Sequence, residues 1–359
     1  MTRIHVLAGG FDTPNGGAFL FPLLLWRDAL RDEGMDVRLF TKLAANLTDC
    51  DTLLIDSKFH RYRWMTDKNS VLADFSAWTE KCYVIYCDTT DSSGSLLVDL
   101  LPIVHGYAKS QLVIDRSAYQ KPMYGHRPFS DYYHRVFGIN DDKPEWSPVV
   151  RNPALLTKLC VSWNSGLADY SLYGPTRMAI YNRLPLSVLL RFARPSRAPS
   201  QPRSKNVSCR FGTAYPRASV AFQRETIREK LARQIDTRKI SRRHYFHELE
   251  TSKIVVSPFG FGEITLKDFE VFSTGGLLLK PDMSHMETWP NLFRDGVTML
   301  SFRWDLSDIE TVLVNALESY NRHVEKAVAG QEAYQAHTTG ADAPGLFIRQ
   351  LRAVIATAQ

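Results

Sequence analysis

The stretch from Lys253 to Asp282, KIVVSPFGFGEITLKDFEVFSTGGLLLKPD, contains the pattern that decides the fold. Residues 253–256 form a β-branched run that Ser-Pro ends, which is typical of a strand. Residues 277–279 are entirely apolar, as in a strand that is buried on both faces of a parallel sheet. The segment between these runs has the glycines and the length of a turn followed by a helix. The stretch therefore predicts strand, turn, helix and strand, which is the repeating unit of an α/β fold.

The turn and the start of this helix have the features of a phosphate site. Gly260 and Gly262 carry no side chain, so their backbone N–H groups can approach a ligand closely. The helix is predicted to open at about Glu263 and to end at Gly275-Gly276. The first N–H groups of a helix have no internal partners and carry a partial positive charge, which suits a phosphate. We therefore expect phosphate contacts at the turn.

Three charged residues are predicted to share one face of this helix. Glu263 and Glu270 are seven residues apart, which is two turns or about 10 Å along the axis, and Lys267 lies between them. Such a stripe has the charges to bind, in order, a sugar, a diphosphate and a ribose. Alternatively, it is a solvated face on which Lys267 pairs with both glutamates. The glycine turn before the stripe favours ligand binding.

This segment resembles the donor-binding motif of GT-B glycosyltransferases, specifically the group-1-like branch that includes CgeB-like proteins. The resemblance covers about residues 206–302 and depends on a Gly-Glu, a basic residue, a Phe-Glu and a small-residue turn. In this sequence these are Gly262-Glu263, Lys267, Phe269-Glu270 and Gly275-Gly276. The best-known retaining GT-B motif has seven residues between its two glutamates, whereas this chain has six. The first half of the chain resembles the family only in layout.

The resemblance implies a GT-B fold, an α/β architecture in which two Rossmann-like domains face a central cleft, and transfer of a sugar from a nucleotide-sugar donor. It implies that Glu270 binds the ribose and that Glu263 binds the donor sugar. The expected donor-binding residues are Arg210, Gly260, Gly262, Glu263, Lys267, Glu270 and Lys280. Basic side chains and helix N-termini can stabilise a departing nucleotide, so we expect no metal and no further cofactor. The expected acceptor is a saccharide or lipid-linked molecule, in the synthesis of surface polysaccharide or glycoconjugate.

Strands and helices alternate in both halves, which indicates α/β domains. Residues 4–8, a glycine-rich loop and a helix open the chain as a Rossmann-like unit, although the loop lacks Gly-x-Gly-x-x-Gly. We expect an N-terminal acceptor-side domain over residues 1–194, a Pro- and Ser-rich linker over 195–205 and a donor-binding domain over 206–335. Residues 336–359 are expected to form a helix that packs back on the N-terminal domain.

Residues 111–181 are irregular and rich in aromatic side chains, and we interpret them as an insertion in the N-terminal domain. Two interpretations are open. An insertion rich in Tyr, Trp and His can supply a wall that binds carbohydrate, or it can form a subdomain with a small core of its own.

An inverting glycosyltransferase needs a base that deprotonates the acceptor hydroxyl. Asp12, Asp88 and Asp91 each follow a predicted strand of the first half at its carboxyl end, where ligands of α/β proteins bind. These aspartates and Glu263 are the catalytic candidates, and Asp91 or Asp88 is preferred as the base. Each aspartate can instead cap a helix or shape a turn, and a retaining enzyme needs no such base.

Composition and charge narrow the remaining possibilities. The 359 residues suffice for two domains, and the longest apolar run is too short to span a membrane. The five cysteines are scattered, as are reduced core thiols in a cytoplasmic protein. Residues 191–243 hold 15 Lys or Arg and 3 Asp or Glu, which indicates an anionic partner such as a nucleotide diphosphate. We expect a cytoplasmic protein, with peripheral contact at the inner face of an anionic membrane as a further expectation, and no nucleic-acid partner.

Two other functional classes fit the same pattern. The first is a sugar-nucleotide epimerase of the GT-B type, and the second is a non-catalytic nucleotide- or polyanion-binding protein. Turnover of the donor separates both enzymes from the binding protein. A requirement for an acceptor separates the transferase from the epimerase.

Overall fold

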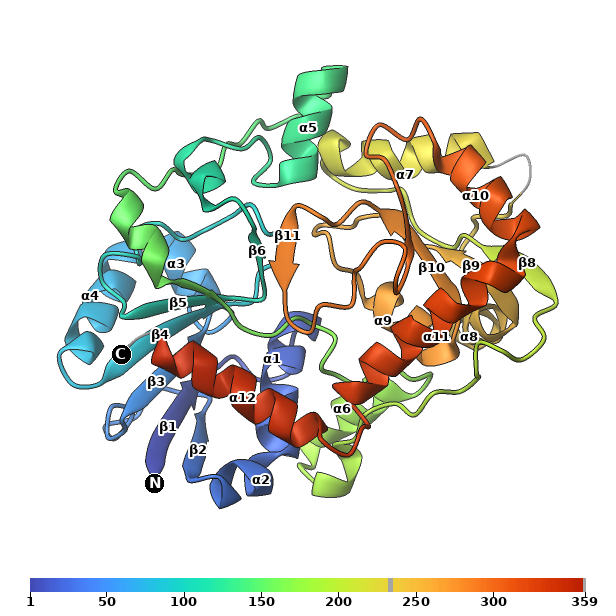
Figure 1. The fold of residues 1–359 in the computed structure, drawn as a ribbon. Helices are drawn as coiled ribbons and strands as arrows, with labels where there is room; N and C mark the ends of the chain where they lie inside the picture. Colours follow the sequence, from blue (N-terminus) through green and yellow to red (C-terminus); the bar gives the residue numbers. More distant parts are fainter. Residues whose placement is uncertain (232–234, 358–359) are drawn as a thin grey trace.

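The computed structural model describes residues 1–231 and 235–357 and contains two large parallel β-sheets, one in each half of the chain (Figure 1). The N-terminal sheet has six strands in the order β2-β1-β3-β4-β5-β7, and every neighbouring pair is parallel. Its strands are β1 (Thr2–Leu7), β2 (Met35–Phe40), β3 (Thr52–Asp56), β4 (Tyr83–Asp88), β5 (Gly106–Lys109) and β7 (Leu159–Val161). The order reverses between β1 and β3, which is the place where doubly wound sheets bind ligands.

Both faces of the N-terminal sheet are covered, because its strands are apolar on both sides. On one face, Val6 and Leu54 pack with Leu20 of α1, and on the other, Leu53 packs with Phe75 of α4. The helices of this half are α1 (Pro14–Leu25), α2 (Arg27–Asp32), α3 (Arg61–Thr66), α4 (Lys68–Thr79), α5 (Pro128–Phe137) and α6 (Gly174–Arg183), with short 3₁₀ turns at Arg116–Gln120, Pro153–Lys158 and Ser187–Leu189.

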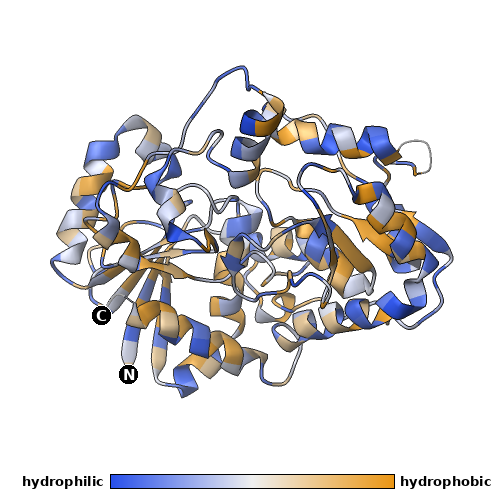
Figure 2. Ribbon diagram, turned by 45° about the horizontal axis from the view of Figure 1, so that its top comes forward, coloured by the Kyte–Doolittle hydropathy of each residue, from blue (hydrophilic) through white to orange (hydrophobic). Residues whose placement is uncertain are grey.

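The C-terminal sheet has four parallel strands in the order β12-β10-β9-β8. They are β8 (Lys205–Ser208), β9 (Ser252–Val256), β10 (Leu277–Pro281) and β12 (Leu300–Phe302), with helices α7 (Ala218–Leu231), α8 (Arg242–Thr251), α9 (Leu266–Thr274), α10 (Ile309–Glu318) and α11 (Tyr320–Ala336). The buried strands of this sheet are among the most hydrophobic parts of the chain (Figure 2). The predicted α/β fold with two Rossmann-like halves is thus confirmed by the strand order.

The helix of the deciding stretch starts later than its sequence predicts. α9 begins at Leu266, and Thr265 caps it through a reciprocal pair of hydrogen bonds with Asp268. The Thr265 N–H donates to the Asp268 carboxylate at 2.8 Å, which completes a capping box. Glu263 therefore lies in the preceding loop, and the predicted polar stripe is reduced to Lys267 and Glu270.

The last helix, α12 (Ala343–Ala356), lies against the N-terminal sheet, on the same face as α1 (Figure 1). Phe347 and Leu351 are fully buried there, in the cluster that holds Ile4 and Trp26. Residues 358–359 of the expected C-terminal helix lie outside the described part of the chain.

The aromatic segment, residues 111–181, does not form a core of its own. Its strand β7 is the edge of the N-terminal sheet, and β6 (Gln111–Val113) pairs antiparallel with β11 (Met286–Thr288) of the C-terminal half. Phe129 and Tyr133 on α5 pack among C-terminal core residues, including Phe259. Trp163 instead packs in the N-terminal core. The segment therefore ties the two halves together, and most of its aromatic rings are structural.

Within the described residues, no helix combines the length and the apolarity that crossing a membrane requires.

Candidate functional site

Three adjoining cavities lie between the two halves, beside the loops that follow β1, β3 and β4. The first, which we name the Glu270 cavity, has about 420 Å³ and is lined by the loop 11–14, by α6 and by Arg242, Leu266 and Glu270. The second, which we name the Asp91 cavity, has about 550 Å³ and is lined by Lys58, His60, Trp64, Asp91, Arg127 and other residues of the N-terminal half, together with Arg217.

A small space of about 20 Å³, which we name the neck, shares lining residues with each of these two cavities. Ala18 lines both the neck and the Glu270 cavity. Thr90 and Asp91 line both the neck and the Asp91 cavity. The neck has room for about one water molecule, and Asp91 lines both the neck and the Asp91 cavity.

Glu270 lies on α9 and lines the Glu270 cavity. Its carboxylate accepts hydrogen bonds from the Tyr245 hydroxyl at 2.9 Å and from Arg242 at 3.4 Å. Burial nevertheless raises the pKa of Glu270, against the charge of Arg242 and the Tyr245 hydrogen bond. Asp12 lines the same cavity from the loop after β1 and is exposed. The structure thus brings Asp12 and Glu270 together.

Glu263 lies elsewhere, at the contact between the two halves. It is fully buried and accepts hydrogen bonds from the Ser92 hydroxyl at 3.2 Å and from the Ser93 hydroxyl and N–H at 2.7 and 3.1 Å. Burial opposes its ionisation, but the His285 imidazole and the Ser93 hydroxyl outweigh burial, so that the pKa of Glu263 is lowered. All of these partners belong to the protein, so Glu263 acts here as a bridge between the halves.

The glycine turn also serves this contact. A Cβ at Gly262 would lie 1.7 Å from the backbone oxygen of Asp91, so only glycine allows the two chains to approach this closely. The Gly260 N–H donates to the Gly262 carbonyl at 2.9 Å. The expectation that the Gly260 N–H is free for a phosphate is therefore wrong, because the turn itself uses it.

Lys267 and Arg224 form a basic cluster on the C-terminal side of the turn. Lys267 donates to the Arg210 carbonyl and lies over the Phe211 ring at 5.5 Å, and burial lowers its pKa to about 8. Arg224 also lies over Phe211, at 5.5 Å, and donates to the Phe259 carbonyl at 2.5 Å. Sequence reasoning missed Arg224. Its position in the basic segment 191–243 was the available signal, but nothing in the sequence distinguished it from its neighbours.

Of the expected donor-binding residues only Glu270 is among the residues that line these three cavities, and Arg210 and Lys280 are bound within the protein. Arg210 is bound to Glu248 at 2.9 Å and to Asp236 at 2.9 Å, and the hydrogen bond with Glu248 raises its pKa. Lys280 is fully buried and pairs with Asp268 at 3.0 Å. In this structure both side chains are engaged in ion pairs within the protein, and their donor-binding role stays a prediction.

The two aspartates after β4 differ in what surrounds them. Asp88 is buried against Lys109 at 2.8 Å, and its oxygens also accept from Tyr107 and Thr90. Burial opposes its ionisation, yet the Lys109 charge and these hydrogen bonds lower the pKa of Asp88. It therefore has no carboxylate oxygen available to an acceptor. Asp91 is exposed, and the amide of Asn15 donates to its Oδ1 at 2.7 Å.

Within the described ranges 1–231 and 235–357, no group of three or more His, Cys, Asp or Glu side chains is placed to hold a metal ion.

Comparison with known proteins gives likenesses of structure alone. No protein-family model matches the chain, and no curated protein matches its sequence. Among solved structures, Anabaena HepE in complex with UDP-glucose is 10% identical with a TM-score of 0.44, covering 98% of this chain and 100% of that one. An α-glucosyltransferase in complex with UDP and a 13-mer DNA containing an HMU base is 11% identical with a TM-score of 0.43, covering 99% of both chains.

The α,α-trehalose 6-phosphate synthase from Burkholderia multivorans is 13% identical with a TM-score of 0.45, covering 100% of this chain and 98% of that one. With TM-scores below 0.5, these likenesses do not establish the function. The two parallel sheets and the cavities between them define the class of this chain as an α/β protein with cavities between two Rossmann-like halves.

Proposed function

We propose that this chain is a glycosyltransferase that moves a sugar from a nucleotide-sugar donor to a hydroxyl group of a saccharide or other acceptor. The observation that carries the proposal is the position of Asp91 at the neck between the Glu270 cavity and the Asp91 cavity. Two substrates bound in the two cavities would meet at an exposed carboxylate, which is the geometry that transfer between them requires.

The Glu270 cavity has the features of the donor site. Glu270 is a carboxylate inside the cavity that can accept hydrogen bonds from ribose hydroxyls, and Arg242 beside it can bind an anionic group. The first residue of α9, Leu266, lines the same cavity, so the partial positive charge of the helix start faces it. Lys267 and Arg224 add positive charge close to the turn. A departing nucleotide is stabilised in this way by the chain itself.

Asp91 has the features of the acceptor base. Asn15 holds its Oδ1, and within the described residues no hydrogen bond is made to its Oδ2. In an inverting reaction the acceptor oxygen forms a bond to the anomeric carbon, the bond from that carbon to the phosphate oxygen breaks, and the hydroxyl proton moves to Asp91 Oδ2. Asp88 does not fit this role, because Lys109, Tyr107 and Thr90 occupy its carboxylate.

The proposal includes the finer expectations from the sequence. Residues 1–194 and 206–335 would be the acceptor-side and donor-binding domains, and the transfer would require no metal. The synthesis of surface polysaccharide or glycoconjugate in a cytoplasm is the corresponding role. This role is supported by the resemblance of the motif that contains Lys267 and Glu270 to the donor-binding motif of GT-B glycosyltransferases.

A thermal-shift panel of UDP, GDP, CMP, ADP and dTDP tests the donor site. One nucleotide should stabilise the wild type and should fail to stabilise Glu270→Ala, while the exposed Glu229→Ala keeps the response of the wild type. A ligand present at about 100 times its dissociation constant adds roughly 2.7 kcal/mol, which is visible as a shift. If no nucleotide stabilises the folded wild type, the proposed donor site does not exist.

Turnover then tests the reaction class. A sugar donor that carries the stabilising nucleotide should be consumed when an acceptor is added. Asp91→Asn should lower the rate of that consumption by about a hundredfold or more without changing nucleotide binding. Isomerisation of the donor with no acceptor present would instead identify an epimerase. Binding without any turnover would identify a non-catalytic nucleotide-binding protein.

A further inference from the structure

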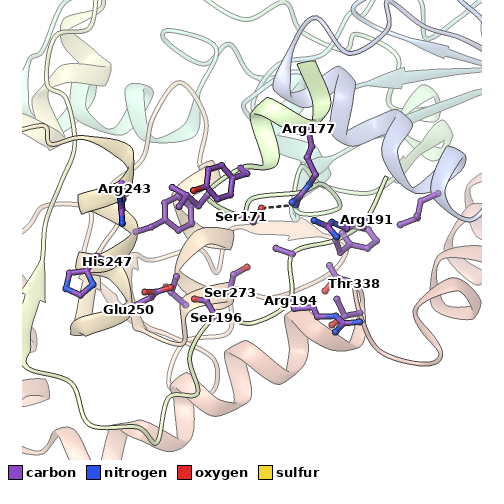
Figure 3. Close-up of a pocket in the computed structure, with 18 residues that line it drawn as sticks. Ser171, Arg177, Arg191, Arg194, Ser196, Arg243, His247, Glu250, Ser273 and Thr338 are labelled. Atoms are coloured by element: carbon purple, nitrogen blue, oxygen red, sulfur yellow. Dashed lines mark hydrogen bonds between the residues drawn. The ribbon is translucent and has the colours of Figure 1, made fainter. Parts of the chain in front are cut away.

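A fourth cavity, larger than the three between the halves, lies where the chain crosses from one half to the other. It has about 990 Å³ and lies between α6, α8, the crossing segment 191–196 and the turn after α11 (Figure 3). We name it the hinge cavity. The chain passes from the N-terminal half to the C-terminal half through segment 191–196 and returns through Thr338 and Thr339, so both crossings contribute to its wall.

The hinge cavity is lined by arginines that the protein leaves without partners. Arg191, Arg194 and Arg243 are exposed, and the described residues offer them no hydrogen bond or ion pair. The other arginines of the described part of segment 191–243 all have partners, such as Glu248 for Arg210 and backbone carbonyls for Arg203. The three unpaired guanidinium groups of this basic segment are therefore the ones gathered at the hinge cavity.

The remaining polar side chains of the cavity offset only part of this charge. Arg177 also lines it but is bound to Asp169 and Ser171. Glu250 is the carboxylate among the lining residues. Arg243 projects from one wall, on α8, while Arg191 and Arg194 lie on the opposite side (Figure 3). A ligand with one negative charge could meet only one wall, whereas a ligand with two or more could bridge both.

We propose that the hinge cavity is a binding site for a small polyanion that carries at least two phosphate or carboxylate groups. Three arginines from two walls can bind separate anionic groups through paired, charge-assisted hydrogen bonds. The hydroxyl groups of Ser171, Ser196 and Thr339 at the wall provide further polar contacts for the ligand. This inference does not depend on the proposed glycosyl transfer.

The site is placed to communicate with the Glu270 cavity. Arg243 and Arg242 are neighbours on α8, and Arg242 lines the Glu270 cavity and donates to the Ser171 and Leu172 carbonyls at 3.0 and 2.9 Å. Ser171 and Leu172 also line the hinge cavity, so one short segment forms part of the surroundings of both. A polyanion in the hinge cavity would therefore contact both chain crossings and also the segment Ser171-Leu172, whose carbonyls accept hydrogen bonds from Arg242.

Calorimetric titration of the full chain with inorganic tripolyphosphate and, separately, with citrate tests the site and distinguishes phosphate from carboxylate ligands. Replacing the three arginines (Arg191→Gln, Arg194→Gln and Arg243→Gln) should weaken binding of the preferred probe roughly tenfold or more. A control with the same charge change, Arg38→Gln, Arg151→Gln and Arg322→Gln, alters exposed arginines outside all the described cavities and should bind as the wild type does.

Lys267→Gln separates the hinge cavity from the proposed donor site, where a polyphosphate can also bind. Hinge binding should persist in Lys267→Gln and weaken by the stated factor in the triple hinge variant. The proposal is overturned if the triple hinge variant, shown to be folded by circular dichroism, retains the affinity of the wild type. It is equally overturned if the control triple variant loses as much affinity as the hinge triple variant, because binding would then follow net charge.

Discussion

The loop that contains Glu263 and the helix that contains Glu270 belong to one stretch of sequence, yet their glutamates have different surroundings. In the loop, Gly262 and Glu263 contact residues 91–93 of the other half, and both carboxylate oxygens of Glu263 accept hydrogen bonds from the protein. On the helix, Glu270 faces a cavity with fewer partners. The pKa of Glu263 is lowered and the pKa of Glu270 is raised, although both carboxylates are buried. A buried carboxylate whose anion the protein already stabilises is structural, whereas one that burial leaves under-compensated is available to a ligand.

The largest effect should come from Gly262→Ala. The added methyl group would overlap the Asp91 backbone, so the contact between the halves must open, and the chain should lose about 3 kcal/mol of stability together with its activity. Gly260→Ala is the matched control, because its Cβ would meet its nearest neighbours at 3.6 Å, an ordinary contact. Thermal unfolding of both variants measures the difference. Equal melting temperatures would show that the loop is not a tight contact.

Glu263→Gln should have the next largest effect and should lower the free energy of unfolding by about 2 kcal/mol at neutral pH. The pKa of Glu263 is below its ordinary value of 4.5 in the folded chain. Its ionised form therefore stabilises the fold above that pH, and this stabilisation is lost as the pH falls through the folded pKa. Denaturant unfolding from pH 7 to pH 3 should show a smaller acid-induced loss in the variant than in the wild type. Parallel pH curves would contradict the bridge.

Glu270→Gln should change stability by no more than about 1 kcal/mol. The pKa of Glu270 is raised in the folded chain, so ionisation opposes folding above its ordinary value of 4.5, and removing the charge relieves that opposition. Nucleotide stabilisation should nevertheless be lost. A variant that is strongly destabilised but still binds nucleotide would reverse the assignment of the two glutamates.

The smallest effect concerns Lys267, whose pKa is lowered to about 8 by burial. A phosphate ligand prefers the charged amine, so affinity for a nucleoside diphosphate should fall as the pH rises above 8, by at most about tenfold for each pH unit. Lys267→Arg keeps its charge in this range and should flatten the profile. Calorimetric titration between pH 7 and pH 9.5 measures both, and a flat profile in the wild type would remove Lys267 from the site.

The elements of the fold could be predicted because their signals are local. The β-branched and apolar runs at 253–256 and 277–279 are strands in the structure. The Gly-Glu signal places the helix start at Glu263, whereas the capping box between Thr265 and Asp268 sets the start at Leu266. The cap was visible in the sequence, since a Thr followed three residues later by an acidic residue is its signature.

The roles of the charged residues could be predicted only in part. Lys280, Arg210 and Asp88 have the charges that a site requires, but each is paired with a residue that only the fold brings near. The choice between a structural and a ligand-binding role depends on such partners, and spacing along the chain does not specify them. The roles of Asp91, which follows β4, and of Glu270, which lies on α9 and lines the Glu270 cavity, stay predictions.

The position of α12 has a consequence for the order in which this protein is made. The face of the N-terminal sheet that holds Ile4 and Trp26 is completed by Phe347 and Leu351, which are synthesised after the C-terminal sheet and its helices. The N-terminal half therefore keeps an apolar face uncovered while the C-terminal half is synthesised. Ribosome-bound chains that stop at residue 342 should remain sensitive to protease in their first half, and chains extended past residue 356 should become resistant. Final compaction of the first half is thus tied to the synthesis of α12.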